Sequence, residues 1–204
     1  MMWKRIVCSV ALAGTVNVTG VGAAEIEGVS FPDKMKMEST ELVLNGTGLR
    51  TKRRLGMSFR VYVAALYLPE KTKDATKVIQ GEGGRVLDLV FLRSLDRDTL
   101  QEAWSEGFKK NCKEDCGQMA APLKTFNDLM SDVKDQSRLR LIFDGKQVQL
   151  ELSGKSRRTG TVAGKAFAKN LLAVFVGDHP PSEELKRGLL GETKIAKVDN
   201  GKGT

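Results

Sequence analysis

The sequence predicts a single domain of the α+β class, on three observations. The chain has 204 residues, which suits one medium-sized domain, and no internal repeat or linker divides it. Hydrophobic residues make up 41% of the chain and charged residues 28%, values typical of a globular protein. Segments with the alternation of strands occur alongside segments with helical spacing. Together these features exclude a long disordered chain, a collagen-like repeat and a multi-pass membrane protein.

Strands dominate the first half of the chain. The strongest strand candidate runs from Ser58 to Leu68, and apolar residues on both of its sides from Val61 onward predict cover on each face. With the segment before it, which ends at Gly56, it would form a long antiparallel hairpin. The other elements expected here are a short strand within 26–36, a strand over 41–44 followed by a turn at Asn45-Gly46, a short helix over 74–80 capped by Asp74, and a strand over 85–93.

Helical patterns are more frequent in the second half. A helix capped by Asp96 or Asp98 runs through Lys110, with apolar residues at helical spacing. Asp144-Gly145 lies between two strand-like segments and indicates a hairpin. The elements expected here are a helix from about 119 to 133, the hairpin strands over 138–143 and 147–152, a further strand over 159–162, a helix over 164–176 ended by Gly177, and a last helix from Glu183 to about Leu190 capped by Ser182.

The first 24 residues predict a cleavable secretory signal peptide. Lys4 and Arg5 precede a stretch without charge that ends in small residues at Ala24. An N-terminal membrane anchor is the alternative, but glycine and polar residues interrupt the apolar run. We therefore expect a periplasmic protein with a domain over 25–191 and a flexible tail over 192–204. Export also argues against a nucleic-acid partner for the basic run at 50–54.

The two cysteines outside the predicted signal peptide and the single histidine limit the chemistry further. Cys112 and Cys116 stand four residues apart, and in an oxidising compartment such a pair forms a local disulfide. A redox-active or metal-binding pair is the alternative, but the spacing is one residue longer than C-x-x-C. The only histidine is His179, so a histidine-rich zinc site is excluded and we expect no metal.

Three segments carry a resemblance to a known family. They are Leu44-Asn-Gly-Thr-Gly-Leu-Arg50, the strand 59–68 that follows, and the segment 170–190 with its Gly-Asp-His-Pro-Pro turn. In order and spacing they resemble the chalcone isomerase family, and the exported form is similar to its bacterial chalcone isomerase-like branch. The resemblance implies an open-faced β-sandwich, a large antiparallel sheet with helices packed on one face. A ligand cleft would lie between the sheet and the helical layer.

The family contains isomerases, fatty-acid-binding members and members without assigned activity. The isomerases are intramolecular lyases that need no cofactor, and they stabilise the charge that develops on a ketone oxygen. Arg50 matches the family's catalytic arginine, and Tyr62 stands where the plant enzyme has a threonine. A guanidinium serves either chemistry, because it stays charged and its rigid fork of donors also binds a carboxylate.

The sequence also departs from the isomerase pattern. The family's catalytic tyrosine should follow the strand that ends near Arg93, but 94–101 contains no tyrosine and Thr99 is the nearest hydroxyl. A polar position linked to flavonoid specificity aligns with Val174, beside Phe175. An apolar lining suits an acyl chain better than a hydroxylated ring system. The ligand-binding residues we expect are Arg50, Tyr62, Thr99, Val174 and Phe175.

Three functional hypotheses follow. The first is a binder of a fatty acid or a similar amphipathic anion, without catalysis. The second is an isomerase of the chalcone isomerase type, in which Arg50 and Tyr62 would be catalytic and the ligand polyphenol-like. The third is a module with a vestigial cleft that contacts an envelope partner through its basic face. The sequence leaves the oligomeric state open.

Overall fold

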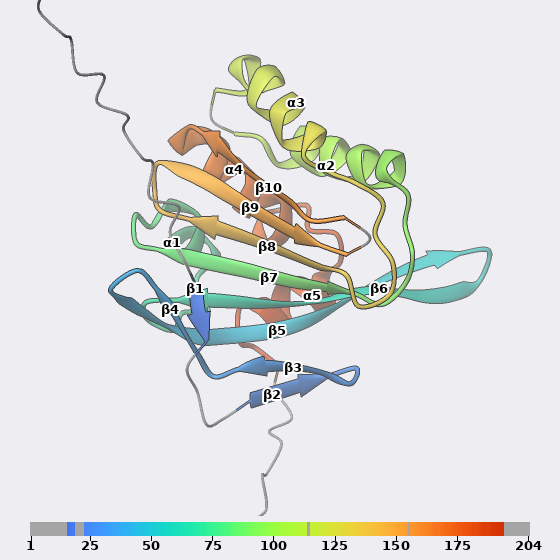
Figure 1. Cartoon of the computed structure of the whole chain (residues 1–204), viewed down its shortest axis with the longest axis horizontal. Helices are drawn as coiled ribbons and strands as arrows, with labels where there is room; N and C mark the ends of the chain where they lie inside the picture. Colours follow the sequence, from blue (N-terminus) through green and yellow to red (C-terminus); the bar gives the residue numbers. More distant parts are fainter. Residues whose placement is uncertain (1–15, 19–22, 114, 155, 194–204) are drawn as a thin grey trace, which may run out of the picture.

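An eight-stranded antiparallel sheet forms the centre of the computed structural model, which describes residues 16–18, 23–113, 115–154 and 156–193 (Figure 1). Its strand order is β1-β4-β5-β6-β7-β8-β9-β10, and a separate two-stranded sheet pairs β2 with β3. The strands are β1 (Val16–Val18), β2 (Ala23–Ile26), β3 (Val29–Pro32), β4 (Lys34–Met37), β5 (Thr40–Arg54), β6 (Met57–Leu68), β7 (Arg85–Phe91), β8 (Arg138–Phe143), β9 (Gln147–Ser153) and β10 (Arg158–Ala163).

The helices pack on one face of this sheet, and the β2–β3 hairpin covers part of the other (Figure 1). Helix α4 contacts α1, α2, β9 and β10, while α5 packs on β5. The helices are α1 (Ala75–Gln80), α2 (Arg97–Asn111), α3 (Ala120–Asp128), α4 (Lys165–Val176) and α5 (Glu183–Leu189), with a 3₁₀ turn at Cys116–Gln118. The predicted α+β architecture, a large antiparallel sheet with helices on one face, is confirmed. No described helix is both long enough and apolar enough to cross a membrane.

Strand β6 lies between two hydrophobic cores, as its apolar residues on both sides predicted. Ala64 and Leu66 join the core beneath the helices, whereas Val63, Ala65 and Tyr67 join the core beneath the β2–β3 hairpin. All five side chains are at most 1% exposed. The central strand is therefore covered on both faces, which fixes its register because a slip by one residue would exchange the two sets.

The turn predicted at Asn45-Gly46 is wrong, because β5 continues through both residues. The pairing of β5 with β6 skips Asn45, which is the extra residue of a β-bulge. Its side chain is buried, donates from Nδ2 to the Leu189 carbonyl at 2.7 Å and accepts the Thr72 N–H at 2.8 Å. Asn45 thus serves as a tertiary clamp rather than as a turn residue.

Two other boundaries differ from expectation. The helix expected to reach Val133 ends at Asp128, because the Val133 main chain exchanges two hydrogen bonds with Leu95, at 2.9 and 3.1 Å. The single short strand expected within 26–36 is divided among β2, β3 and β4. The break between β2 and β3 falls at Glu27 and Gly28, which both have positive φ.

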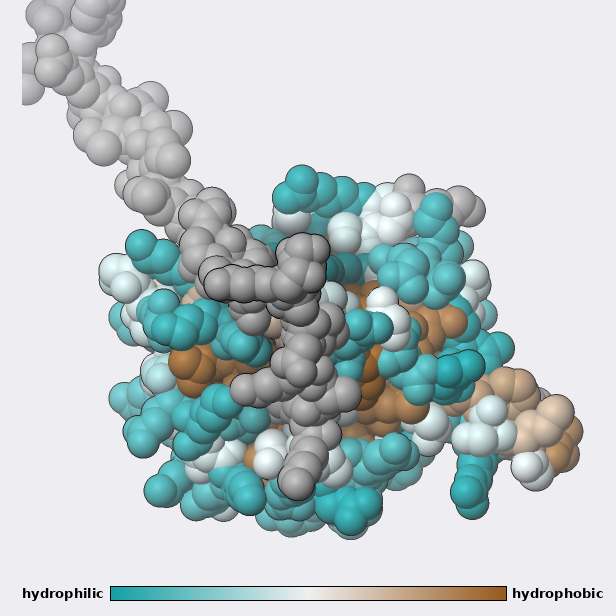
Figure 2. All heavy atoms as spheres, turned by 90° about the horizontal axis from the view of Figure 1, so that it is seen from below, coloured by the Kyte–Doolittle hydropathy of each residue, from teal (hydrophilic) through white to brown (hydrophobic). Residues whose placement is uncertain are grey.

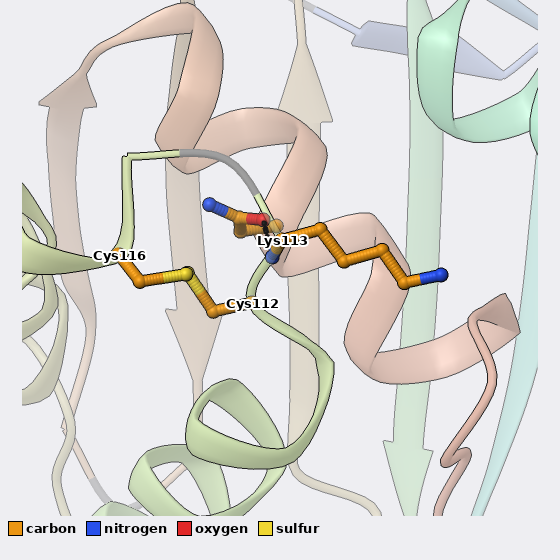
Figure 3. Close-up of a disulfide and its surroundings, with 4 residues drawn as sticks. Cys112, Lys113 and Cys116 are labelled. Atoms are coloured by element: carbon orange, nitrogen blue, oxygen red, sulfur yellow. Dashed lines mark hydrogen bonds between the residues drawn. A yellow bond between two sulfur atoms is a disulfide. The ribbon is translucent and has the colours of Figure 1, made fainter.

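The Cys112–Cys116 disulfide is present, with a Cα–Cα distance of 5.8 Å (Figure 3). It closes the segment that follows α2, where the Lys113 N–H donates to Asn170 Oδ1 on α4 at 3.3 Å. The predicted signal peptide falls mainly outside the described residues, as does most of the predicted tail. Cleavage after Ala24 would leave β3 paired with Glu25 and Ile26 alone.

Candidate ligand-binding cavity

A cavity of about 480 Å³ lies between the sheet and α2, with α4 at its base. Its size falls within the roughly 300–1,000 Å³ common for small-molecule sites. Most of its wall is apolar and comes from β6, the end of β7, α2 and α4. The apolar lining residues are Phe59, Val61, Phe91, Leu95, Leu100, Ala103, Trp104, Gly107, Val174, Pro180 and Pro181, and the polar ones are Arg50, Lys52, Tyr62, Arg93, Thr99, Glu106, Lys110 and His179.

The Gly46-x-Gly48-x-Arg50 motif explains how an arginine reaches this cavity. Alternate residues of a strand share a face, so these three lie on the helix side of β5. A Cβ atom on Gly46 would lie 2.1 Å from the Gly188 carbonyl oxygen, and one on Gly48 would lie 2.6 Å from that of Leu185. The glycines let the α5 backbone rest directly on the strand. Arg50 follows on the same face, just beyond the helix, and enters the cavity.

A β-bulge in β6 adds aromatic surface to the same wall. Arg50 pairs with Tyr62 and Thr51 pairs with Arg60, so Val61 has no partner on β5. Strict alternation would place Phe59 and Val61 on the face opposite Tyr62. Because of the bulge, all three line the cavity.

Arg50 and Tyr62 are the least exposed of the polar residues in the lining. They are cross-strand neighbours; Arg50 is half-buried and Tyr62 is buried. Arg50 Nη1 donates to the Thr51 carbonyl, and its positive charge acts on the Tyr62 phenol. Burial raises the pKa of Tyr62 well above its usual value, and the charge of Arg50 only partly opposes this. The phenol is protonated at neutral pH, like any tyrosine, and can donate a hydrogen bond.

The tyrosine environment gives a prediction about pH. The chain contains only Tyr62 and Tyr67, and burial raises the pKa of both. The folded protein should therefore show no tyrosinate absorbance at about pH 10, where unfolded tyrosines are half-ionised. Because the unfolded state releases these protons first, the contribution of the two tyrosines to the free energy of unfolding should be complete below about pH 10. It should fall as the pH rises further. Tyrosinate absorbance at pH 10 in protein that keeps its native circular dichroism would contradict the burial of these residues.

Exposed charges form the rim of the cavity. Lys52 and Arg93 come from the sheet side, and Glu106 and Lys110 come from α2. Glu106 and Lys110 pair with each other at 2.5 Å, and the Arg93 guanidinium lies 5.2 Å from the centre of the Phe59 ring. Lys52 and Arg93 therefore leave the sheet side of the mouth positively charged.

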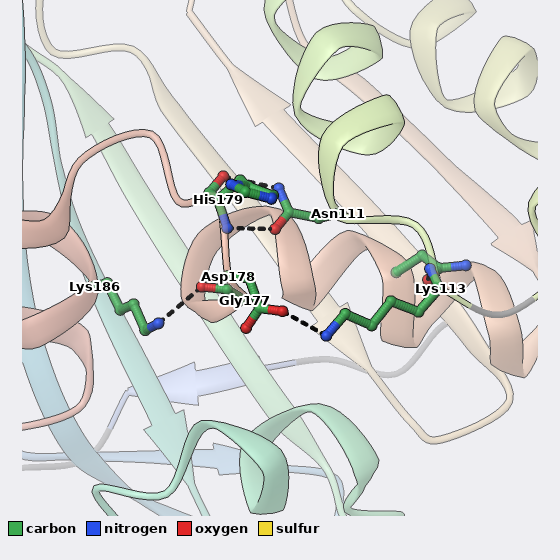
Figure 4. Close-up of polar contacts among 7 residues, drawn as sticks. Asn111, Lys113, Gly177, Asp178, His179 and Lys186 are labelled. Atoms are coloured by element: carbon green, nitrogen blue, oxygen red, sulfur yellow. Dashed lines mark hydrogen bonds and ion pairs between the residues drawn. The ribbon is translucent and has the colours of Figure 1, made fainter.

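The turn after α4 closes another side of the cavity, and three side chains hold it (Figure 4). The buried Asn111 amide donates to the His179 carbonyl at 2.8 Å and accepts the His179 N–H at 2.9 Å. Lys113 Nζ lies 2.5 Å from Asp178 Oδ2, and Lys186 Nζ donates to the Gly177 carbonyl at 2.8 Å. His179 is thus fixed through its main chain, which keeps it and the two prolines after it at the wall.

Four of the five expected ligand-binding residues lie in this one cavity: Arg50, Tyr62, Thr99 and Val174. Thr99 stands at the start of α2, where its N–H donates to the capping Asp96 side chain at 2.7 Å. Phe175 is not among the lining residues; it packs against Trp104 with ring centres 5.6 Å apart. The roles of the four in binding remain predictions.

Sequence reasoning missed Trp104, whose helical spacing indicated only a core position. Trp104 lines the cavity, and its Nε1 is buried without a hydrogen-bond partner among the described residues. Gly107, one turn later, brings α2 against α4, because a Cβ there would lie 2.7 Å from a Val174 methyl group. No cluster of three or more potential metal ligands occurs in the described part of the chain.

Comparisons with known proteins agree with this architecture. The family described as chalcone isomerase-like matches residues 23–191. Among solved structures, a fatty-acid binding protein from Arabidopsis thaliana has a TM-score of 0.66 and 18% identity, over 84% of this chain and 96% of that one. At that identity the likeness shows the fold alone. No curated protein sequence matches the chain.

Proposed function

The chain belongs to the chalcone isomerase-like family, and from that membership we propose that it binds a fatty acid or similar amphipathic anion in the periplasm, without catalysis. The observation that carries this proposal is that the cavity combines hydrogen-bond donors with a largely apolar wall. Two donors, Arg50 and Tyr62, lie beside a wall that is otherwise mainly apolar. The donors would bind a carboxylate, and the apolar wall would hold the chain attached to it.

The chemistry of the donors suits a carboxylate. A guanidinium offers two parallel N–H groups to the two oxygens, and such charge-assisted bonds are stronger than neutral ones. The Tyr62 phenol can add a third bond, because a tyrosine hydroxyl is protonated at neutral pH. Phe59, Phe91 and Trp104 provide aromatic surface for the acyl chain. The fatty-acid binding protein that shares the fold is consistent with this ligand class.

The isomerase alternative rests on the same pair, which could stabilise an enolate oxygen. It is less well supported, because the family's catalytic tyrosine is absent from 94–101 and Tyr62 is the only tyrosine on the helix side of the sheet. The chain's other tyrosine, Tyr67, lies in the core beneath the β2–β3 hairpin. A cyclisation assay with 2′-hydroxychalcone tests this alternative, and turnover lost in Arg50→Ala would favour it over simple binding.

The experiment that tests the proposed function is native mass spectrometry of the mature protein purified from the periplasm, followed by organic extraction. We expect a mature chain beginning at Glu25 and a co-purifying fatty acid or related anion that is absent from Arg50→Ala. An empty cavity that also refuses added fatty acids would contradict the binder and favour a module that contacts an envelope partner. Recovery of the unprocessed chain from the cytoplasm would contradict export.

A further inference from the structure

We propose that the tip of the β5–β6 hairpin docks on an anionic lipid surface and thereby places the mouth of the cavity against the membrane. The hairpin tip is defined here as residues 52–59. It is an arm of two strands, because the pairing of β7 with β6 begins only at Tyr62. Four further residue pairs, from Thr51–Arg60 to Arg54–Met57, extend it by about 13 Å at 3.3 Å per residue. Figure 1 shows this arm projecting from the body at the right.

The apolar residues at the end of this arm are unusual for the molecule. Leu55 is 89% exposed and Met57 is 58% exposed, and in the described part of the chain no other large hydrophobic side chain is exposed to this extent. In Figure 2 the arm protrudes at the right with a hydrophobic end and hydrophilic neighbours. A protruding apolar end with polar flanks is typical of a surface that contacts a membrane or a partner.

The turn itself does not explain the leucine. Leu55 and Gly56 both have positive φ, 50° and 77°, as the central residues of a type I′ turn do. This turn favours asparagine or aspartate at its first central position, because leucine adopts the left-handed conformation unfavourably. A leucine that is unfavourable for the turn and contacts no core indicates selection for something outside the molecule.

The charge around the tip favours a lipid surface over an apolar protein groove. Residues 50–61 include no acidic residue and five basic ones: Arg50, Lys52, Arg53, Arg54 and Arg60. Lys52 and Arg53 are exposed, whereas Arg60 pairs with Glu27. Basic residues beside inserted apolar side chains are the combination that binds anionic bilayers.

The position of the tip links docking to the cavity. Met57 and Phe59 are two residues apart on β6 and share a face, and Phe59 lines the cavity together with Lys52, its partner on β5. An apolar stripe therefore leads from the tip to the cavity wall. This inference extends the proposed function, since an acyl chain could pass along the stripe from bilayer to cavity. Docking itself requires no bound ligand.

Vesicle flotation tests the proposal with the ligand-free protein. Wild type should bind vesicles of phosphatidylcholine with about 30% phosphatidylglycerol at about 0.15 M salt, and bind pure phosphatidylcholine far less. Leu55→Asn combined with Met57→Thr should weaken binding at least about tenfold. Asparagine suits the turn, so a loss of folding would not explain this result. Arg53→Glu should weaken binding about fivefold or more.

The matched control is Lys77→Glu on α1, an exposed basic residue remote from the hairpin in Figure 1. It should bind vesicles as wild type does, within about twofold. Failure of wild type to float with anionic vesicles would overturn the proposal and favour a protein partner for the tip. Equal binding by the Leu55→Asn/Met57→Thr variant, or an equal loss in Lys77→Glu, would also overturn it. The tip variant should still bind dodecanoate as wild type does, because neither substituted residue lines the cavity. A loss of docking can therefore be told apart from a loss of ligand binding.

Discussion

Replacing Arg50 by alanine is expected to weaken the binding of dodecanoate by about 10–100-fold, because a hydrogen-bonded charge partner contributes roughly 1.5–3 kcal/mol. Arg50 is half-buried, and its cross-strand neighbour Tyr62 would keep one donor for the carboxylate. Isothermal titration calorimetry measures the loss. Tyr62→Phe should have a smaller effect, about 10-fold or less, because it removes one neutral donor.

Two controls make this result specific. Arg53→Ala removes a neighbouring charge that is exposed and does not line the cavity, so dodecanoate affinity should stay within about threefold of wild type. Dodecanol carries the same chain without the charge, and its weaker binding should not depend on Arg50. If Arg50→Ala and wild type bound dodecanoate equally, the carboxylate would have to bind elsewhere.

Replacing Gly46 by alanine is expected to lower the free energy of unfolding by about 3 kcal/mol or more, the upper range for overpacking. The added Cβ would lie 2.1 Å from the Gly188 carbonyl oxygen, and within 3 Å of two other main-chain atoms of the 188–191 segment. A side chain could rotate away, but here a helix backbone must move. Urea denaturation followed by circular dichroism measures the change.

Gly117→Ala is the matched control, because a Cβ at Gly117 meets no heavy atom within 4 Å and its φ is not positive. Its free energy of unfolding should stay within about 0.5 kcal/mol of wild type. A loss below about 1 kcal/mol in Gly46→Ala would show that α5 does not rest directly on β5. The placement of Arg50 would then need another explanation.

The sequence predicted most of the fold, because its signals were local. Asp74, Asp96 and Ser182 cap helices as expected, and each accepts a main-chain N–H of the first turn. The hairpin around Asp144-Gly145 and the doubly covered strand β6 were also expected. The predictions that failed concern positions that depend on contacts between residues far apart in the chain. Asn45 resembled a turn residue, but the pairing of β5 with β6 makes it the extra residue of a bulge, and its side chain binds the end of α5, 144 residues away in the chain.

The candidate site was partly predictable, because some of its positions follow from local patterns in the sequence. The Gly-x-Gly-x-Arg motif places Arg50 by strand alternation alone. Its pairing with Tyr62 depends on the bulge at Val61, because the register of the hairpin tip would otherwise set Arg50 opposite Val61. The positions of Phe59 and Val61 depend on a bulge that leaves no clear pattern in the sequence. Trp104 had the spacing of a core residue, and its position at the cavity depends on how closely Gly107 lets α2 approach α4.

A crystal structure of the protein with dodecanoate would show where the carboxylate binds. We expect it within hydrogen-bonding distance of the Arg50 guanidinium and the Tyr62 hydroxyl, with the acyl chain along Trp104 and Val174. A second hollow, of about 200 Å³ and lined in part by Lys113, Lys169 and Lys186, provides an alternative location. A carboxylate bound there, or an empty cavity at saturating ligand, would show that Arg50 and Tyr62 do not form the binding site.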